Sequence, residues 1–241
     1  MNAVTPTAGS HRPGGFRPQR VLPDWSSVLA VVAHPDDETF GLGAIVDGFA
    51  GRGAAVHVLC FTRGEASALN ANDADLRVAR EAELRQASAE LGVASVTLLD
   101  YPDSGLSAQP ADELAGHVFV AAARHHADGL VVFDETGVTG HPDHQAATSA
   151  AVRAATGAGL PVLAWALPAT IAARLHEETG MAFAGQAPEN IALCVRVRRA
   201  RQRRAAFMHA SQISPTAVLW RRLQLQGDCE HLRWLIPPRH A

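Results

Sequence analysis

The sequence predicts an α/β fold, a Rossmann-like three-layer α/β/α sandwich with a mostly parallel sheet of five to seven strands. Two observations predict it. Short apolar runs of strand length alternate along the chain with longer segments that carry apolar residues at helical spacing. Two of these runs are followed by a His-Pro-Asp sequence and then by a helical segment. Strand, polar loop and helix form the repeating unit of such sheets.

The first strand covers residues 28–33, which have the length and β-branched content of a strand buried on both faces. Gly41 and Gly43 belong to the helix expected at residues 39–52, where their small size permits close packing on the sheet. They are not a dinucleotide fingerprint, because they lie inside the helix and the third glycine is missing. Further strands are expected at residues 54–61, 95–99, 129–133, 161–167 and 191–197, and helices at 75–91, 112–127 and 145–155.

Two later segments are less regular. Residues 168–188 are expected to cap the pocket, although Met181 and Phe183 could equally belong to the core. Residues 217–238 carry leucine and tryptophan at helical spacing and are expected to pack on the sheet.

Length and composition predict one domain. A chain of 241 residues can bury a substantial core, and residues 23–241 are assigned to a single domain. Residues 1–22 are rich in glycine, proline, serine and arginine and contain no acid, which is typical of a mobile N-terminal arm. An oligomer contact or a substrate lid is the alternative for this arm.

The overall charge predicts a small-molecule substrate and no nucleic-acid partner. Apolar residues make up 47% of the chain and the formal net charge is -3. Six arginines fall between Arg196 and Arg204, but no aromatic residues are interleaved, so a solvated helix face is favoured over a nucleic-acid patch. No apolar run approaches the roughly 20 residues of a membrane span, so no membrane partner is expected. A homo-oligomer is left open.

The cysteines predict a cytoplasmic location. Cys60, Cys194 and Cys229 are odd in number and have no CxxC spacing, and the first two lie in strand-like runs where a reduced, buried thiol is usual. Residues 1–20 have no hydrophobic core of the kind found in a signal peptide.

The first candidate site follows the first strand. The apolar run 28–33 ends at His34, and after a proline come three acids, Asp36, Asp37 and Glu38. Ligands of open α/β sheets bind beyond the carboxyl ends of the strands, so this loop lies where a site is expected. His34 and Asp37 are three residues apart across a loop that enters a helix, which lets an imidazole nitrogen and a carboxylate oxygen converge on one metal ion.

A second segment repeats this pattern. The run 129–133 is followed by Gly-His-Pro-Asp-His at residues 140–144 and then by an alanine-rich helix. His144 or His141 would complete a set of two histidines and one carboxylate with an open position for water, which is typical of a catalytic zinc site. Each motif alone could be a turn and helix cap, but two of them at the ends of two strands favour a metal site.

Together these motifs resemble the PIG-L/LmbE-like family of zinc-dependent N-deacetylases, which act on N-acetylglucosamine-containing substrates. The family's Ala-His-Pro-Asp-Asp-Glu matches residues 33–38, and its His-Pro-Asp-His matches residues 141–144. The resemblance extends from about residue 28 to the C-terminus.

The resemblance implies roles for the residues of both motifs. It implies one Zn²⁺ per chain bound by His34, Asp37 and His144, with Fe²⁺ as the alternative in vivo. It further implies that Asp36 is the general base and that His141 stabilises the oxyanion or supports the ligands from behind.

Other segments are implied to contact the substrate. Arg63 follows the second strand at the same edge as His34, and its guanidinium can present a donor fork to sugar hydroxyls or a phosphate; an exposed loop arginine is the alternative. Asp103 is implied to accept hydrogen bonds from substrate hydroxyls, with an Asx turn as the structural alternative. Ala66 and Ser67 replace a further glycine of many relatives, which leaves the substrate's identity open. Second-tier site candidates are Glu38, Asp143, Arg80, Glu81, His209 and Gln212.

The implied reaction is the hydrolytic removal of an N-acetyl (N-acyl) group. Zinc lowers the pKa of a bound water from 15.7 toward roughly 7, and Asp36 takes the proton of this water as it attacks the acetamide. The metal and, if protonated, His141 stabilise the oxyanion. Either Asp36 or His141 returns a proton to the amine. The sign of the pKa shift of Asp36 stays open, because Asp37 raises this pKa and a dication lowers it.

Four other functions are compatible with these residues. One is an amidase that cleaves a thiol (mycothiol-type) conjugate, and another is a metal-dependent hydratase or lyase on the same scaffold. Two histidines and one carboxylate also form the facial triad of Fe(II) oxygenases, which usually have antiparallel barrels. A non-catalytic sugar-binding module would be expected to lose Asp36 or a metal ligand. The complete Asp36-Asp37 pair and the Arg63 segment favour the deacetylase.

Overall fold

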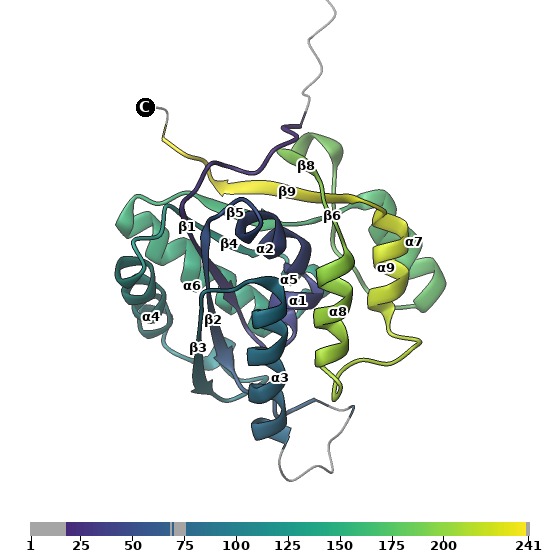
Figure 1. The fold of residues 1–241 in the computed structure, drawn as a ribbon, viewed down its shortest axis with the longest axis horizontal. Coiled ribbons are helices and arrows are strands. Elements are labelled where there is room, and N and C mark those ends of the chain that lie inside the picture. The colour runs from purple at the N-terminus through teal and green to yellow at the C-terminus, as the bar shows by residue number, and fades with distance from the viewer. Residues whose placement is uncertain (1–17, 68, 70–75, 240–241) are drawn as a thin grey trace, which may run out of the picture.

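The central sheet contains seven strands in the order β3-β2-β1-β4-β5-β9-β8 (Figure 1). The computed structural model of the protein describes residues 18–67, 69 and 76–239. The strands are β1 (Ser27–Val32), β2 (Ala55–Thr62), β3 (Ser95–Tyr101), β4 (Gly129–Phe133), β5 (Val162–Trp165), β8 (Leu193–Arg196) and β9 (Cys229–Ile236). Among the described strands of this sheet, β9 runs in the direction opposite to the other six. The predicted mostly parallel sheet is confirmed.

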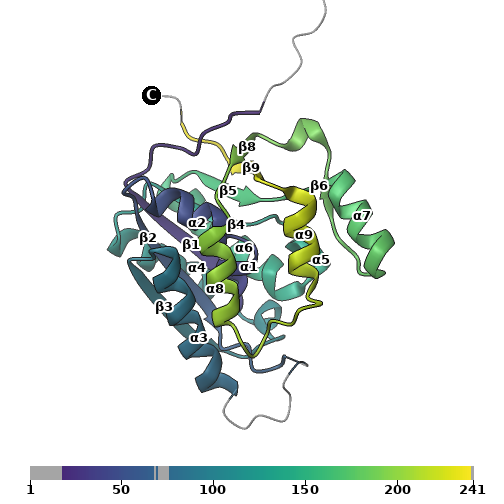
Figure 2. The same cartoon turned by 45° about the vertical axis from the view of Figure 1, so that its right-hand side comes forward.

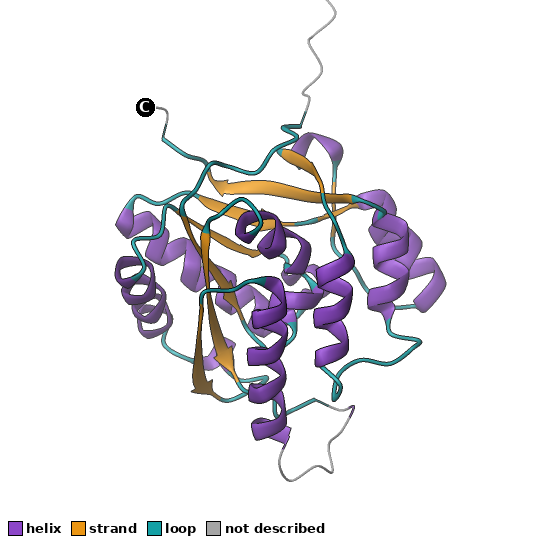
Figure 3. Ribbon diagram, in the orientation of Figure 1, coloured by secondary structure: helices purple, strands orange, loops and turns teal. Residues whose placement is uncertain are grey.

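Helices cover both faces of this sheet (Figures 2 and 3). They are α1 (Asp37–Phe40), α2 (Gly43–Ala50), α3 (Leu76–Leu91), α4 (Ala111–Arg124), α5 (Gly137–Gly140), α6 (Pro142–Ala158), α7 (Ala169–Thr179), α8 (Ala200–Met208) and α9 (Val218–Gln226). A separate two-stranded pair is formed by β6 (Leu167–Pro168) and β7 (Gly185–Gln186).

The alternation of side chains along β1 divides the interior into two cores. Val28, Ala30 and Val32 pack in one apolar cluster with residues of α2, α3 and α8. Leu29 and Val31 point to the opposite face and pack with residues of α4 and α6. Because every residue of this strand faces a covered side, the continuous apolar run is explained, and the predicted α/β/α sandwich is confirmed.

The helix predicted at residues 39–52 is interrupted. α1 ends at Phe40, Gly41 is its C-cap, and α2 begins at Gly43. A Cβ atom on Gly41 would lie 2.2 Å from the ring of Phe133, and one on Gly43 would lie 2.9 Å from Cγ of Gln202. The close packing of Gly41 on the sheet is therefore confirmed, whereas Gly43 makes room for a side chain of α8.

The helical spacing of residues 217–238 predicts only the first half of this segment correctly. α9 ends before Gly227, whose φ of 59° is left-handed. The chain then enters β9, where Glu230 and Leu232 are fully buried. β9 is therefore a strand of the sheet itself, between β5 and β8, and does not pack on its face as expected. In this half of the segment the alternation of buried and less buried residues favours a strand over the helix that the leucine and tryptophan spacing predicts.

The beginning of the chain makes contact with β8. Residues 1–17 of the predicted mobile arm lie outside the described residues. Gln19 donates its N–H to the carbonyl of Ala192 at 2.8 Å and accepts one from Cys194, while Leu22 is buried in the core. Residues 18–22 therefore pack against the domain.

The arginines between 196 and 204 do not all lie on a solvated helix face. Arg196 is in β8 and pairs with Asp228. Arg199 is 9% exposed and pairs with Glu230, which is fully buried. The prediction of a solvated helix face is therefore wrong for Arg199, which compensates the charge of the Glu230 carboxylate inside the domain. None of the described helices combines the length and apolarity that crossing a membrane would demand.

We expect Gly41→Ala to lower the free energy of unfolding by about 1–3 kcal/mol. The added Cβ would enter the space of the Phe133 ring, which itself packs against His144 and Trp165. Urea denaturation followed by circular dichroism measures the effect. Gly116→Ala in α4 is the matched control, because nothing lies within 4 Å of its added Cβ, and it should stabilise by about 0.5–1 kcal/mol. Equal effects of the two substitutions would contradict the packing argument.

Candidate metal centre

The two histidine motifs meet because β1 and β4 are adjacent parallel strands. His34 lies just beyond the carboxyl end of β1, and Asp37 begins α1. His144 lies in the first turn of α6, which follows β4 through the short helix α5. The edge of the sheet predicted to hold the site therefore brings the three predicted ligands together.

Three donor atoms converge on one point. Nε2 of His144 lies 3.2 Å from Nδ1 of His34 and 3.2 Å from Oδ1 of Asp37. Nδ1 of His34 lies 3.6 Å from Oδ2 of Asp37. All three ligand atoms lie within 4.8 Å of one another.

Hydrogen bonds on the outer side fix which nitrogens hold protons. Nε2 of His34 lies 3.0 Å from Asp103 and 3.3 Å from Asp143, and carboxylates only accept. Nδ1 of His144 lies 3.1 Å from the carbonyl oxygen of Gly137. Once a cation displaces the protons of the inner nitrogens, both imidazoles can therefore direct a lone pair inward, next to the Asp37 carboxylate. Three acceptors without a donor between them fit a divalent cation.

The surrounding charges also favour a cation. Burial lowers the pKa of His34, but Asp103, Asp143 and Asp37 together raise it to about 12. Burial also lowers the pKa of His144, and Asp37 raises it above its usual value. The carboxylates around these two imidazoles thus stabilise positive charge at the centre.

A second set of possible ligands, His34, His141 and Asp143, fits a metal less well. Asp143 is fully buried, and its two oxygens accept the N–H groups of Ser104 at 2.7 Å and Leu106 at 3.1 Å. Its remaining contact is with His34. Asp143 therefore fixes the orientation of the His34 ring through the ring nitrogen that points away from the centre, as is usual for acids next to metal-binding imidazoles.

His141 is the N-cap of α6, and its Nδ1 accepts the N–H of Asp143 at 3.2 Å. The proton of the neutral ring is therefore on Nε2. Burial lowers the pKa of His141, and His34 and His144 lower it further. The sequence interpretation makes oxyanion stabilisation conditional on a protonated His141, and burial and the two neighbouring imidazoles disfavour that form.

Asp36 is held in an unusual backbone conformation beside the ligands. Its φ of 116° is left-handed, although it is not glycine. Its N–H donates to Oε2 of Glu38 at 2.9 Å, and its carboxylate accepts from Nη2 of Arg80 at 3.1 Å. Burial raises the pKa of Asp36 to about 6, and Arg80 opposes this rise. In the metal-free site, burial and Asp37 thus outweigh the effect of Arg80 on this pKa.

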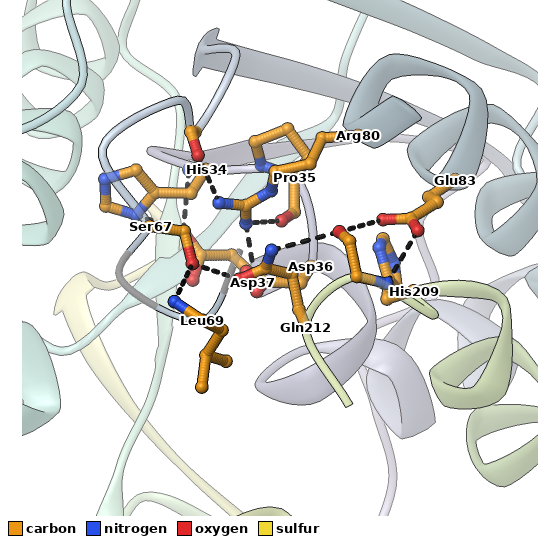
Figure 4. A network of polar contacts seen from close by, with 12 residues as sticks. His34, Pro35, Asp36, Asp37, Ser67, Leu69, Arg80, Glu83, His209 and Gln212 are labelled. Atoms are coloured by element: carbon orange, nitrogen blue, oxygen red, sulfur yellow. Dashed lines mark hydrogen bonds and ion pairs between the residues drawn. The ribbon is translucent and has the colours of Figure 1, made fainter. Parts of the chain in front are cut away.

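Arg80 of α3 joins the loops that follow β1 and β2, and Figure 4 shows it beside Pro35 and Asp36. Its guanidinium donates to the carbonyls of Gly64, at 2.6 Å, and of Pro35, and it contacts Asp36. Gly64 has a φ of 68°, and a Cβ there would lie 2.3 Å from the guanidinium. A glycine is therefore needed at position 64 for Arg80 to reach Asp36.

A second buried pair lies behind Asp36. Oε1 of Glu38 accepts from Nε2 of His209 at 2.9 Å, and both residues are fully buried. Closer to the surface, Gln212 accepts the hydroxyl proton of Ser67 at 2.6 Å (Figure 4). The segment that follows α8 thus brings the second-tier candidates His209 and Gln212 next to the site.

A polar cavity of about 280 Å³ opens at the centre. Asp103 lines it and also accepts the N–H of Ala66 at 2.9 Å. Burial raises the pKa of Asp103, but His34 and Ala66 lower it to about 2. The residues that line this cavity come from both motifs and three further loops: His34, Asp36, Asp37, Ala66, Ser67, Arg80, Asp103, Ser104, His141, His144 and Gln212.

Arg63 does not line this cavity. Its Nε donates to Asp100 at 2.8 Å, and its Nη1 donates to Glu81. Glu81 also accepts from Arg85 at 2.9 Å. These two predicted site residues therefore form a half-exposed ion-pair network beside the rim.

A second, largely apolar cavity of about 210 Å³ shares Asp37 and His144 with the polar one. Met181 and Phe183, from the segment expected to cap the pocket, belong to its wall. The remaining lining includes Phe40, Phe133, Trp165, Val218 and Arg222.

The sequence analysis misses Asp134. This buried carboxylate accepts from the hydroxyl of Thr136 at 2.7 Å, from Gln186 at 3.2 Å and from Arg233 at 3.0 Å. It thereby shapes the turn whose Gly137 carbonyl orients His144. An acid directly after a buried strand is a signal for this role, but its partners on β7 and β9 are distant in sequence.

Comparisons with known proteins give relatives of this chain. The family described as "PIG-L: GlcNAc-PI de-N-acetylase" matches residues 29–155. The 1D-myo-inositol 2-acetamido-2-deoxy-alpha-D-glucopyranoside deacetylase of Rhodococcus erythropolis is 34% identical over 68% of this chain and 67% of that protein. The enzyme of the same name from Geodermatophilus obscurus is 34% identical over 56% of this chain and 54% of that one. The chain spans about half to two thirds of the length of these relatives.

Solved structures share the fold at low sequence identity. The A40926 pseudoaglycone deacetylase Dbv21 has a TM-score of 0.68 and 20% identity, covering 90% of this chain and 100% of its own. The N,N'-diacetylchitobiose deacetylase of Pyrococcus horikoshii has a TM-score of 0.65 and 19% identity, with coverages of 88% and 85%. The 4-carboxy-2-hydroxymuconate hydratase GalB of Pseudomonas putida has a TM-score of 0.67 and 18% identity, with coverages of 90% and 98%. These likenesses establish the fold alone.

We expect Asp143→Asn to weaken zinc binding by roughly 10–100-fold. The amide would keep one acceptor oxygen, whereas Ser104, Leu106 and His34 all approach the carboxylate. Competition with a coloured chelator measures the affinity.

Asp128→Asn is the matched control for this substitution. Asp128 also accepts two backbone N–H groups, from Ser26 at 2.6 Å and Ser27 at 3.0 Å, but at the opposite edge of the sheet. Its zinc affinity should equal that of the wild type. Unchanged affinity in the Asp143 variant would show that the carboxylate does not orient His34.

Proposed function

Because this chain belongs to the PIG-L family of de-N-acetylases, we propose that it is a zinc-dependent hydrolase that removes an N-acetyl group from a small molecule containing N-acetylglucosamine. The observation that carries this proposal is the convergence of three acceptor atoms of His34, Asp37 and His144 within 4.8 Å, next to the buried carboxylate of Asp36. One Zn²⁺ per chain, with Fe²⁺ as the alternative in vivo, is the proposed cofactor.

When bound by these residues, zinc supplies an activated water and Lewis-acid polarisation of the amide carbonyl. Asp36 acts as the general base. Burial raises its pKa in the metal-free site, and bound zinc would lower it, so the carboxylate is ionised and free to accept the proton of the water. Arg80 holds this carboxylate in place.

His141 acts as a neutral donor to the oxyanion. Its Nδ1 is occupied by the N–H of Asp143, so Nε2 carries the proton that faces away from the helix. Positioned donors of this kind stabilise developing negative charge without a change in their own protonation. In this proposal the proton for the departing amine comes from Asp36, because it holds the proton taken from the water.

The polar cavity is the proposed site for the amino sugar. Asp103 uses one oxygen toward His34 and the other toward Ala66, and each carboxylate oxygen can accept a further donor, so sugar hydroxyls can bind there. Arg63 uses two of its five N–H groups on Asp100 and Glu81. The other three remain for a substrate that reaches the rim.

We expect Asp36→Asn to lower the rate of amine release by roughly 10²–10⁴-fold while one zinc ion per chain is kept. The amide cannot take a proton from water, but Asp36 is not among the converging ligands. Amine release from a panel of N-acetylglucosamine derivatives, with metal analysis of the same samples, measures both quantities. Asp112→Asn is the control, since Asp112 pairs with Arg153 at an exposed site.

Two results would contradict parts of the proposal. If the Asp36 variant lost its zinc, the separate roles of base and ligand would be wrong. If the metal-loaded wild type released no amine from any derivative, the deacetylase assignment would fail. Hydration of an unsaturated acid and cleavage of a thiol conjugate would then be assayed.

A further inference from the structure

Two of the three cysteines are neighbours at the edge of the sheet, far from the candidate metal centre in the strand order. Cys194 lies in β8 and Cys229 in β9, and their Sγ atoms are 3.3 Å apart. Both are half-buried free thiols, whereas Cys60 is fully buried in the core. The sequence interpretation places Cys194 among buried thiols, but its position at the edge leaves it within reach of small molecules.

The strand register explains why these side chains face each other. Cys194 is paired with His231, and Arg196 with Cys229. Residues two apart on a strand point to the same face, so Cys194 and Cys229 are diagonal neighbours on one face of the antiparallel pair. β8 is the last strand of the sheet, and the N–H of Cys194 is held on its outer side by the carbonyl of Gln19 at 2.8 Å.

A metal does not account for this pair. Nε2 of His231 lies 3.7 Å from Sγ of Cys194, which would offer a third ligand. Among the described residues, however, the groups of three possible ligands within 4.8 Å of one another all contain His34. The cluster therefore offers two adjacent thiols and a nearby imidazole rather than a coordination site.

We propose that Cys194 and Cys229 form an intrachain disulfide when the protein meets a hydroperoxide. The thiolate of Cys194 attacks the peroxide O–O bond, which gives a sulfenic acid and, with hydrogen peroxide, one water. The thiolate of Cys229 then attacks that sulfur and releases a second water. Two thiols are oxidised, one peroxide is reduced, and both thiol protons leave in water.

The surroundings make this disulfide slow to form. Burial raises the pKa of Cys194 to about 11, and Cys229 raises it in the same direction. The thiolate is the reactive form, so it is scarce at neutral pH. His231 is the nearest group that can take the proton. We therefore expect the disulfide to form during prolonged exposure to an oxidant and not during a brief exposure.

The disulfide would connect the two ends of residues 194–229. This segment contains α8 and α9, and it supplies His209 and Gln212 to the site and Arg222 to the apolar cavity. Closing a loop of this length restricts the unfolded chain. We therefore expect the oxidised protein to unfold at a temperature higher by roughly 5–15 °C.

The experiment counts free thiols in the intact wild-type chain. Protein is treated with hydrogen peroxide for minutes to hours, denatured, alkylated with iodoacetamide and weighed by mass spectrometry. We expect the number of labels to fall from three to one, with the remaining label on Cys60, and a tryptic peptide that links Cys194 to Cys229. Non-reducing electrophoresis should show the monomer, and thermal unfolding should shift upward until a reductant is added.

Cys194→Ser and Cys229→Ser are matched controls. Cys194→Ser should keep two labels before and after treatment, because Cys229 then has no sulfenic acid to attack. Cys229→Ser should lose the label on Cys194 to a sulfenic or sulfinic acid without forming a cross-link. Neither variant should show an upward shift of its unfolding temperature. Three labels after prolonged treatment of the wild type would overturn the proposal, and so would sulfinic acid on Cys194 without a cross-link or a disulfide between two chains. The readouts are independent of catalysis, so the outcome stands whether or not the deacetylase proposal holds.

Discussion

The carboxylate of Asp37 is the contact on which the rest of the site depends. One of its oxygens accepts the N–H groups of Ala33 at 3.2 Å and His34 at 2.9 Å, and the other faces Nε2 of His144. It thereby ties the end of β1 to the start of α1 and to α6. The turn that results forces Asp36 into its left-handed conformation, which places a second carboxylate beside the first.

Two like charges this close need compensation, and the structure supplies it from different directions. The two imidazoles lie next to Asp37, whereas Arg80 lies next to Asp36. Glu38, the third acid of the motif, is turned away and pairs with His209 inside the domain. Three consecutive acids thus have three separate electrostatic environments, which is how adjacent residues can serve as ligand, base and structural anchor.

The sequence predicts the part of the site that local order determines. The motifs around His34 and His144 each follow a strand, and parallel neighbouring strands bring such segments to one edge. The sheet class follows from the same alternation of strands and helices.

The remaining features depend on partners that are distant in the chain. Nothing local to Asp134 indicates Arg233, and nothing local to Arg199 indicates Glu230, because each pair forms only when β9 enters the sheet. β9 is itself hard to predict, since it follows α9 after a single turn and runs against its neighbours. The position of Arg63 is a similar case. Its place at the sheet edge follows from β2, but its partner Glu81 comes from α3.

The salt bridge between Asp134 and Arg233 has a consequence for how much of the chain the site needs. The family model matches residues 29–155, and the proposed ligands and the proposed base all lie within this range. Arg233, Gln186 and His209 lie beyond it, yet they compensate buried carboxylates next to those ligands. A fragment that ended after α6 would keep the proposed ligands and the proposed base. It would lose Arg233 and His209, which pair with the buried carboxylates of Asp134 and Glu38. The part of the chain that the proposed site needs is therefore larger than the two motifs, because it includes their polar partners from the last strand.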